Sequence, residues 1–66
     1  MGTIATEEFN MKVNRFNIIS IDLATGQERI IKTDVIPADR DYELSEARRN
    51  AEYFETITFE VYEVEV

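Results

Sequence analysis

The last eleven residues of the chain, 56–66, carry its strongest strand signal. Ile57, Phe59 and Val61 alternate with polar residues, which is the period of two expected of a strand with one buried face. Beyond Val61 the apolar positions shift by one residue, onto Tyr62 and the valines that follow. This change of parity predicts a bulge, or an exposed end that meets another chain.

Two earlier segments, 11–23 and 28–36, are also rich in β-branched residues and predict strands. Gly26 lies between them and can adopt the positive φ that a short hairpin loop requires. Pro37 ends the second segment because proline lacks the amide donor that a ladder needs. Residues 11–36 are therefore expected to form one antiparallel hairpin.

The first of these segments does not alternate cleanly. Phe16 and Ile18 share one parity, whereas Ile19 begins a run of apolar residues on the other. Either both faces of this strand are covered, or a bulge near Ile18 and Ile19 changes the face that it presents.

A helix is expected over residues 42–54, because apolar residues recur there at intervals of three and four. Asp39 or Asp41 is suited to cap its N-terminus, and Arg48 and Glu52 are spaced to form a surface ion pair. The apolar stripe consists of Leu44, Ala47, Ala51 and Phe54.

The order strand, strand, helix, strand predicts an α+β fold in which one helix packs on a three-stranded antiparallel sheet. Residues 11–66 would form this single small domain, and residues 1–10 a flexible N-terminal tail. So small a core favours a homodimer or edge pairing with a partner. The helix stripe is expected to cover Phe16, Ile18, Ile31, Ile57, Phe59 and Val61.

The chain has no cysteine and no histidine, which removes thiolate and imidazole catalysis and most zinc and copper sites. Asp39, Asp41 and Glu43 have the spacing of a calcium loop, but Leu44 and Asn50 stand where that loop needs glycine and glutamate. A catalytic carboxylate pair would need a cleft that this small core can hardly form. We therefore expect no enzyme, no metal and no cofactor.

The chain contains 14 acids and 7 bases, a net charge of −7. Residues 1–49 hold nine acids and all seven bases, whereas residues 50–66 hold five acids and no base. This balance argues against direct binding of nucleic acid, which needs cations. It favours a partner protein with a basic surface, or else a solvated acidic face that maintains solubility.

The predicted partner-binding site is the acidic last strand, with Glu60, Glu63 and Glu65 as carboxylates and Tyr62 as an anchor. Either a basic groove of the partner receives the acids, or the strand adds to the edge of the partner's sheet. The alternative is an ordinary solvent-exposed face. Arg48 and Arg49 are candidates for contact with an acidic patch of the partner.

Three further aromatic residues are Phe9, Tyr42 and Tyr53. Any of them that lies outside the core would be an anchor for a protein interface, although Tyr53 is expected to pack in the core. The chain has no run of about 18 apolar residues that would predict a membrane helix, and its lack of cysteine fits the cytoplasm.

The order of elements, the length and the acidity resemble the small podovirus proteins that inhibit the host RNA polymerase. The last strand, with Phe59, Glu60, Val61 and Val64, is similar to that family's Phe-Glu-Val-x-x-Val pattern. The resemblance implies a phage protein in the cytoplasm of a bacterial host. This sequence departs from the family's pattern at Glu63 and Glu65, because the family's last strand carries arginines that bind the polymerase.

The expected function is that of a non-catalytic inhibitor which binds a basic surface of a host nucleic-acid-processing protein, such as RNA polymerase or a defence nuclease. Other small acidic phage proteins, including anti-CRISPR and related anti-defence proteins, imply the same mode. The alternative is a structural or assembly module that self-associates through its C-terminal strand.

Overall fold

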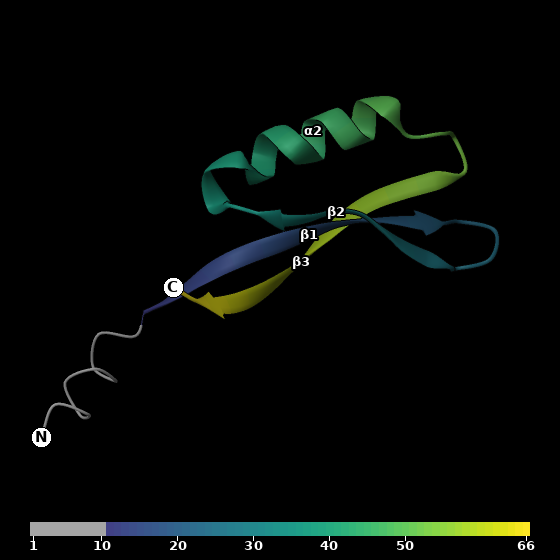
Figure 1. The fold of residues 1–66 in the computed structure, drawn as a ribbon. Coiled ribbons are helices and arrows are strands. Elements are labelled where there is room, and N and C mark those ends of the chain that lie inside the picture. The colour runs from purple at the N-terminus through teal and green to yellow at the C-terminus, as the bar shows by residue number, and fades with distance from the viewer. Residues whose placement is uncertain (1–10) are drawn as a thin grey trace, which may run out of the picture.

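A computed structural model describes residues 11–66, which form one three-stranded sheet and one α-helix. The sheet has the order β2-β1-β3 and is antiparallel throughout. The helix lies across one face of it (Figure 1), which confirms the α+β prediction. The predicted tail, 1–10, lies outside the described residues. The elements are β1 (Lys12–Asp22), β2 (Glu28–Val35), the 3-10 turn η1 (Pro37–Asp39), α2 (Arg40–Asn50) and β3 (Glu55–Glu65).

The hairpin between β1 and β2 forms where the sequence predicts it. Gly26 has a φ of 77°, a conformation that residues with a Cβ rarely adopt. Asp22 Oδ1 accepts hydrogen bonds from the amides of Ala24, at 2.8 Å, and Thr25, at 3.1 Å. This Asx-turn orders the loop between β1 and β2.

The pairing of β1 with β3 is regular from Lys12 opposite Glu65 to Asp22 opposite Glu55. No bulge therefore follows Val61 on this side, and the predicted bulge at that point is wrong. Because side chains alternate between the two faces of a strand, the apolar residues after Val61 simply change to the face opposite α2.

The irregularity expected near Ile18 and Ile19 is present, but its extra residues belong to β2. Phe16 stands opposite Val35 and Ile18 opposite Lys32, so two steps on β1 match three on β2. A second shift follows between Ile18 and Ile19. Asp34 lies in the first shift with a φ of 58°, and aspartate is one of the few residues that tolerate this region.

Both neighbouring isoleucines of β1 are buried, although they point to opposite faces. Ile18 belongs to the core beneath α2, whereas Ile19, 5% exposed, stands between Ile30 of β2 and Thr58 of β3. The strand therefore keeps its alternation, and its central position in the sheet buries residues of both parities.

The helix ends earlier than its apolar stripe predicts. Arg40–Asn50 is helical, and Ala51 is extended with a ψ of 145°. Asp39 occupies the N-cap position but makes no side-chain cap, so the predicted capping bond is absent. None of the helices in the described part of the chain has the length and apolar content that a membrane crossing needs.

The buried cluster joins the sheet to α2 through Phe16, Ile18, Val35, Leu44 and Ile57, with Ala47 and Ala51 packed against it. Val35 was not among the expected core residues, because the shifts in β2 decide which of its residues faces α2.

Four predicted core residues are exposed by 38 to 55%, so this part of the prediction is wrong. Ile31 lies at the second shift of the irregular edge strand β2, and Phe54 follows the end of α2. Phe59 and Val61 lie on β3, the other edge of the sheet. A single helix does not cover the whole face of the sheet, so part of each side chain stays exposed.

Tyr53 is 94% exposed, which contradicts its expected place in the core. It lies in the connection between α2 and β3, where its ring packs edge-on against Phe54 with 5.5 Å between centroids. Tyr42 is also exposed, on α2.

Candidate functional site: the free edge of β3

β3 is an edge strand, and within residues 11–66 no strand pairs with its outer side. The direction of its backbone groups follows from the bonds at its two ends. The Leu23 amide donates to the Phe54 carbonyl at 2.8 Å, and the Val66 amide donates to the Met11 carbonyl at 3.0 Å. Phe54 and Val66, which are even-numbered, therefore form hydrogen-bonded pairs with the residues that flank β1.

Hydrogen-bonded and non-hydrogen-bonded pairs alternate along an antiparallel ladder. The even-numbered residues of β3 therefore turn their N–H and C=O groups toward β1, and the odd-numbered residues turn theirs to the free edge. The outward-facing backbone belongs to Ile57, Phe59, Val61, Glu63 and Glu65.

The predicted carboxylates lie along this edge but not on one face. Ile57 is buried with Leu44 beneath α2, so Glu63 and Glu65, which have the same parity, lie on the helix side of the sheet. Glu60 and Tyr62 lie on the opposite side. The structure thus divides the predicted site between two faces that share the edge of β3.

The edge is acidic because β3 carries four glutamates and no base. Lys12 of β1 stands opposite Glu65, and Arg15 stands opposite Tyr62. The Arg15 guanidinium instead pairs with Asp34 on β2, at 3.4 Å, which directs its charge to the other edge of the sheet.

Glu60 is held in place on the face opposite α2. Its Oε1 accepts a hydrogen bond from Asn17 Nδ2 at 2.9 Å, and Asn17 Oδ1 accepts one from Thr33 Oγ1 at 2.7 Å. This chain of polar side chains crosses all three strands and fixes one carboxylate of the candidate site.

An apolar strip lies on the helix side of the same edge. Phe59 is 38% exposed and Val61 55% exposed. The Phe59 ring meets Phe16 edge-on at 5.5 Å, and the Arg40 guanidinium lies 5.2 Å from both ring centroids. Such an arginine is held by the electron-rich ring faces.

The far end of the edge belongs to a two-stranded ribbon, residues 12–15 paired with 62–65. The pairing of β1 with β2 stops at Phe16 and Val35, so only these two segments continue. Figure 1 shows this end of β1 and β3 projecting past α2. A partner could therefore approach Glu63 and Glu65 without meeting the helix.

The two arginines of the predicted site lie elsewhere. Arg48 and Arg49 are exposed in the last turn of α2, the turn that leads into the start of β3, whereas Glu63 and Glu65 lie at the end of β3. Arg49 pairs with Glu46 at 2.6 Å. The expected pair of Arg48 with Glu52 does not form among the described residues, since the helix ends before Glu52.

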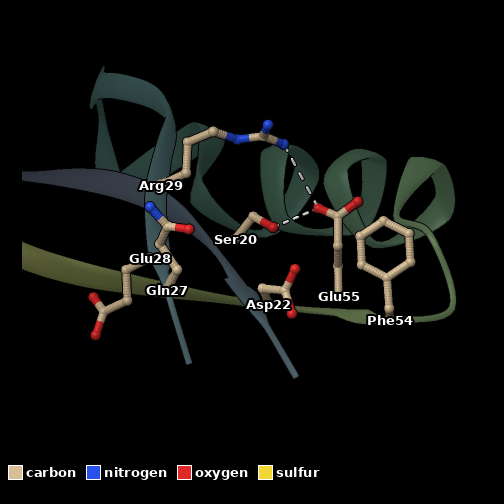
Figure 2. A pocket seen from close by; sticks show the side chains of 7 residues that line it. All are labelled: Ser20, Asp22, Gln27, Glu28, Arg29, Phe54 and Glu55. Atoms are coloured by element: carbon tan, nitrogen blue, oxygen red, sulfur yellow. Dashed lines mark hydrogen bonds and ion pairs between the residues drawn. The ribbon is translucent and has the colours of Figure 1, made fainter. Parts of the chain in front are cut away.

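A second polar group lies at the opposite end of the sheet and was not predicted. This group lines a recess of about 400 Å³. Figure 2 shows Ser20 pointing toward Glu55 in this recess, with the Arg29 side chain approaching from β2. The Ser20 hydroxyl donates a hydrogen bond to Glu55 Oε2, and Arg29 Nη2 lies 3.7 Å from the same oxygen. Ser20, Asp22, Gln27, Glu28, Arg29, Phe54 and Glu55 line the recess.

These contacts stabilise the charged form of Glu55. The hydrogen bond from Ser20 is the main cause that lowers its pKa, and the Glu52 amide, which donates at 3.3 Å, lowers it further against a smaller opposing effect of burial. The group fastens the start of β3 to the other two strands. No signal for it exists in the sequence, where Ser20 and Glu55 are 35 residues apart.

Acidic residues alone do not form a metal site in the described part of the chain. No group of three potential ligands is gathered there. The acids at 39, 41 and 43 instead occupy the first turns before and within α2, where negative charge favours the helix dipole.

Comparison with protein families, with curated proteins and with solved structures found no match to this chain. The resemblance to podovirus polymerase inhibitors thus stays a prediction, which rests on the order of elements, the length, the acidity and the residues of the last strand.

Proposed function

We propose that this protein is a non-catalytic inhibitor that binds a basic surface of a nucleic-acid-processing protein through the edge of β3. The observation that carries the proposal is that β3 holds four carboxylates and no base, on a strand whose outer edge pairs with no other strand within residues 11–66. Glu60, Glu63 and Glu65 are its exposed acids.

Charge complementarity decides the class of partner. Surfaces that bind nucleic acid are rich in lysine and arginine, and they attract carboxylates over about a Debye length at low salt. A ligand that covers such a surface excludes the nucleic acid from it. The podovirus resemblance suggests RNA polymerase as the partner, and the broader likeness to small acidic anti-defence proteins suggests a defence nuclease. In either case, Glu63 and Glu65 require that the contacted site be basic.

The proposal is tested by capture from a bacterial lysate followed by competition. The wild type is compared with the triple variant Glu60→Lys, Glu63→Lys, Glu65→Lys. A matched control, Glu28→Lys, Asp39→Lys, Glu52→Lys, has the same net charge but changes exposed acids away from the edge of β3. We expect the wild type and the control to capture the same protein, and the edge variant to lose it.

The captured protein should bind DNA or RNA, and added nucleic acid should release it from the wild type. Affinity measured with the purified partner should fall as salt rises. Equal affinity of the edge variant at low salt would overturn the proposal, as would a partner that binds its nucleic acid and this protein at the same time.

A further inference from the structure

The structure points to the way in which the partner is held: we infer that an extended basic segment of the partner pairs with β3 as an added antiparallel strand. This inference rests on the proposed function and adds the binding mode and the chemistry of the recognised segment. Such pairing requires an available backbone edge, side chains that select the segment, and charges that exclude a second copy of this chain.

The backbone edge is available over a long stretch. The odd-numbered residues from Ile57 to Glu65 turn their N–H and C=O groups outward, and pairing of β3 with β1 is unbroken over the whole strand. A regular strand of this length presents the hydrogen-bonding pattern that an incoming strand needs.

The two edges of the sheet differ in this respect. β2 has two register shifts, a residue with a φ of 58° at Asp34, and exposed Lys32. Bulges and charged residues, especially lysine, are features that protect an edge from pairing. β3 has no bulge, and its charged residues are all glutamates, which repel a second copy of the strand but attract a basic segment. Addition of a basic strand is therefore directed to β3.

The side chains along β3 define what the added strand must carry. On the helix side, the exposed parts of Phe59 and Val61 call for apolar residues opposite them, and Glu63 and Glu65 call for bases. On the other side, Glu60 calls for a base. The recognised segment therefore carries bases opposite Glu60, Glu63 and Glu65 and apolar residues opposite Phe59 and Val61, in a fixed register.

A second copy of this chain has the wrong charge for the same place. Pairing β3 with another β3 would bring together two strands with four glutamates each and no base. In the symmetric register centred on Glu60, that residue would stand opposite its own copy, and Glu55 opposite Glu65. Like charges directly opposite each other destabilise strand pairs, and in other registers the four glutamates of each strand still repel those of the other across a short distance. The occupant is therefore a basic segment of a different protein.

The probe is the peptide Lys-Val-Lys-Thr-Val-Lys-Val-Thr-Val, designed to run antiparallel to β3 from Glu65 to Ile57. Its lysines then stand opposite Glu65, Glu63 and Glu60, and two of its valines opposite Val61 and Phe59. Binding is followed by titration into the ¹⁵N-labelled full chain, with the amide signals of β3 as the readout.

Two N-methylated forms of the peptide separate strand pairing from charge attraction. Methylation of the two valines opposite Val61 and Phe59 removes amides that would face β3. Methylation of the two threonines opposite Tyr62 and Thr58 alters amides that would face away. We expect the parent and the threonine-methylated peptide to bind alike, and the valine-methylated peptide to bind about tenfold more weakly or worse.

Each other outcome is decisive. Equal binding of all three peptides would overturn strand addition while leaving the charge-based proposed function intact, which the capture experiment tests independently. Absence of binding by the parent peptide would also overturn it. Concentration-dependent shifts of β3 amides without peptide would show that a second copy takes the edge instead.

Discussion

Glu55 joins three strands at one carboxylate. It starts β3, accepts a hydrogen bond from Ser20 of β1, and lies 3.7 Å from Arg29 of β2. Ser20 is 4% exposed, and a buried hydroxyl without a partner destabilises a fold. The pair therefore satisfies a polar group that would otherwise weaken the sheet beside the hairpin.

Replacement Glu55→Gln should make the stability of the protein less dependent on pH. Because the folded pKa is below the usual 4.5, ionised Glu55 stabilises the fold above that value, and this contribution is lost as pH falls through the folded pKa. Thermal unfolding should show E55Q to be less stable than wild type at pH 7, with a difference that shrinks on acidification. Glu28→Gln is the control, and a difference that does not vary with pH would contradict this role.

Substitutions of Asp34 test whether β2 requires a positive φ at this position. Its φ of 58° suits aspartate, asparagine and glycine but strains a β-branched residue by about 1–2 kcal/mol. Asp34→Val should therefore be less stable than Asp34→Asn by this amount in urea unfolding. Both variants lose the carboxylate that pairs with Arg15, so the difference isolates the backbone term. Equal stabilities would mean that β2 relaxes into a regular strand.

Few side chains attach α2 to the sheet. Leu44 is its one buried residue, with Ala47 and Ala51 packed beside it. Lys32 Nζ lies 2.7 Å from Glu43 Oε2, and this hydrogen bond and charge raise the pKa of Lys32. Because the pair is exposed, it adds little. Apolar packing at Leu44 is the main attachment of the helix.

Leu44→Ala should destabilise the fold by about 2–5 kcal/mol, which is the usual cost of such a deletion in a core. A domain of this size has a total stability of about 3–10 kcal/mol, so much of the variant should be unfolded. Leu44→Met, which conserves volume, should cost less than about 1.5 kcal/mol. Urea unfolding measures both, with exposed Ser45→Ala as the control; a mild effect of L44A would show that α2 is only loosely attached.

The elements themselves could be predicted from the sequence because each has a clear period or a clear breaker. The hairpin follows from Gly26 and Pro37, and the last strand follows from its alternation. The end of α2 could not be predicted, since Ala51 and Phe54 continue the apolar stripe after the backbone has become extended. The shifts in β2 have no signal in an ordinary sequence such as Thr33-Asp34.

The candidate site was predicted in part. The strand that carries it is the predicted one, but Glu60 and Glu63 are an odd number of residues apart, and the period of a strand already places them on opposite faces. Arg48 and Arg49 could not be located relative to β3 without knowing how α2 crosses the sheet. Ser20 and Glu55 meet only through the register of β1 and β3.

The acids of β3 also affect how this chain associates with its own copies in the absence of a partner. An exposed, regular edge strand tends to pair with copies of itself, and like charges oppose this. The same glutamates that would select a basic partner would then keep the protein monomeric.

The triple variant Glu60→Thr, Glu63→Thr, Glu65→Thr should therefore self-associate, because it keeps β-forming residues and loses the repulsion. Sedimentation velocity over a range of concentrations measures this. The control, Glu28→Thr, Asp39→Thr, Glu52→Thr, has the same net charge and should stay monomeric. Association of both variants would mean that total charge matters and not its position; association of neither would show that the edge of β3 is protected by something other than charge.

The shifts in β2 also determine the stoichiometry of any complex. Within residues 11–66, β3 is the regular edge that can accept an added strand, whereas β2 is irregular. Each chain therefore offers one site for strand pairing. A complex built on this edge should hold one partner segment in direct contact with each chain, and titration should saturate at a ratio of one to one.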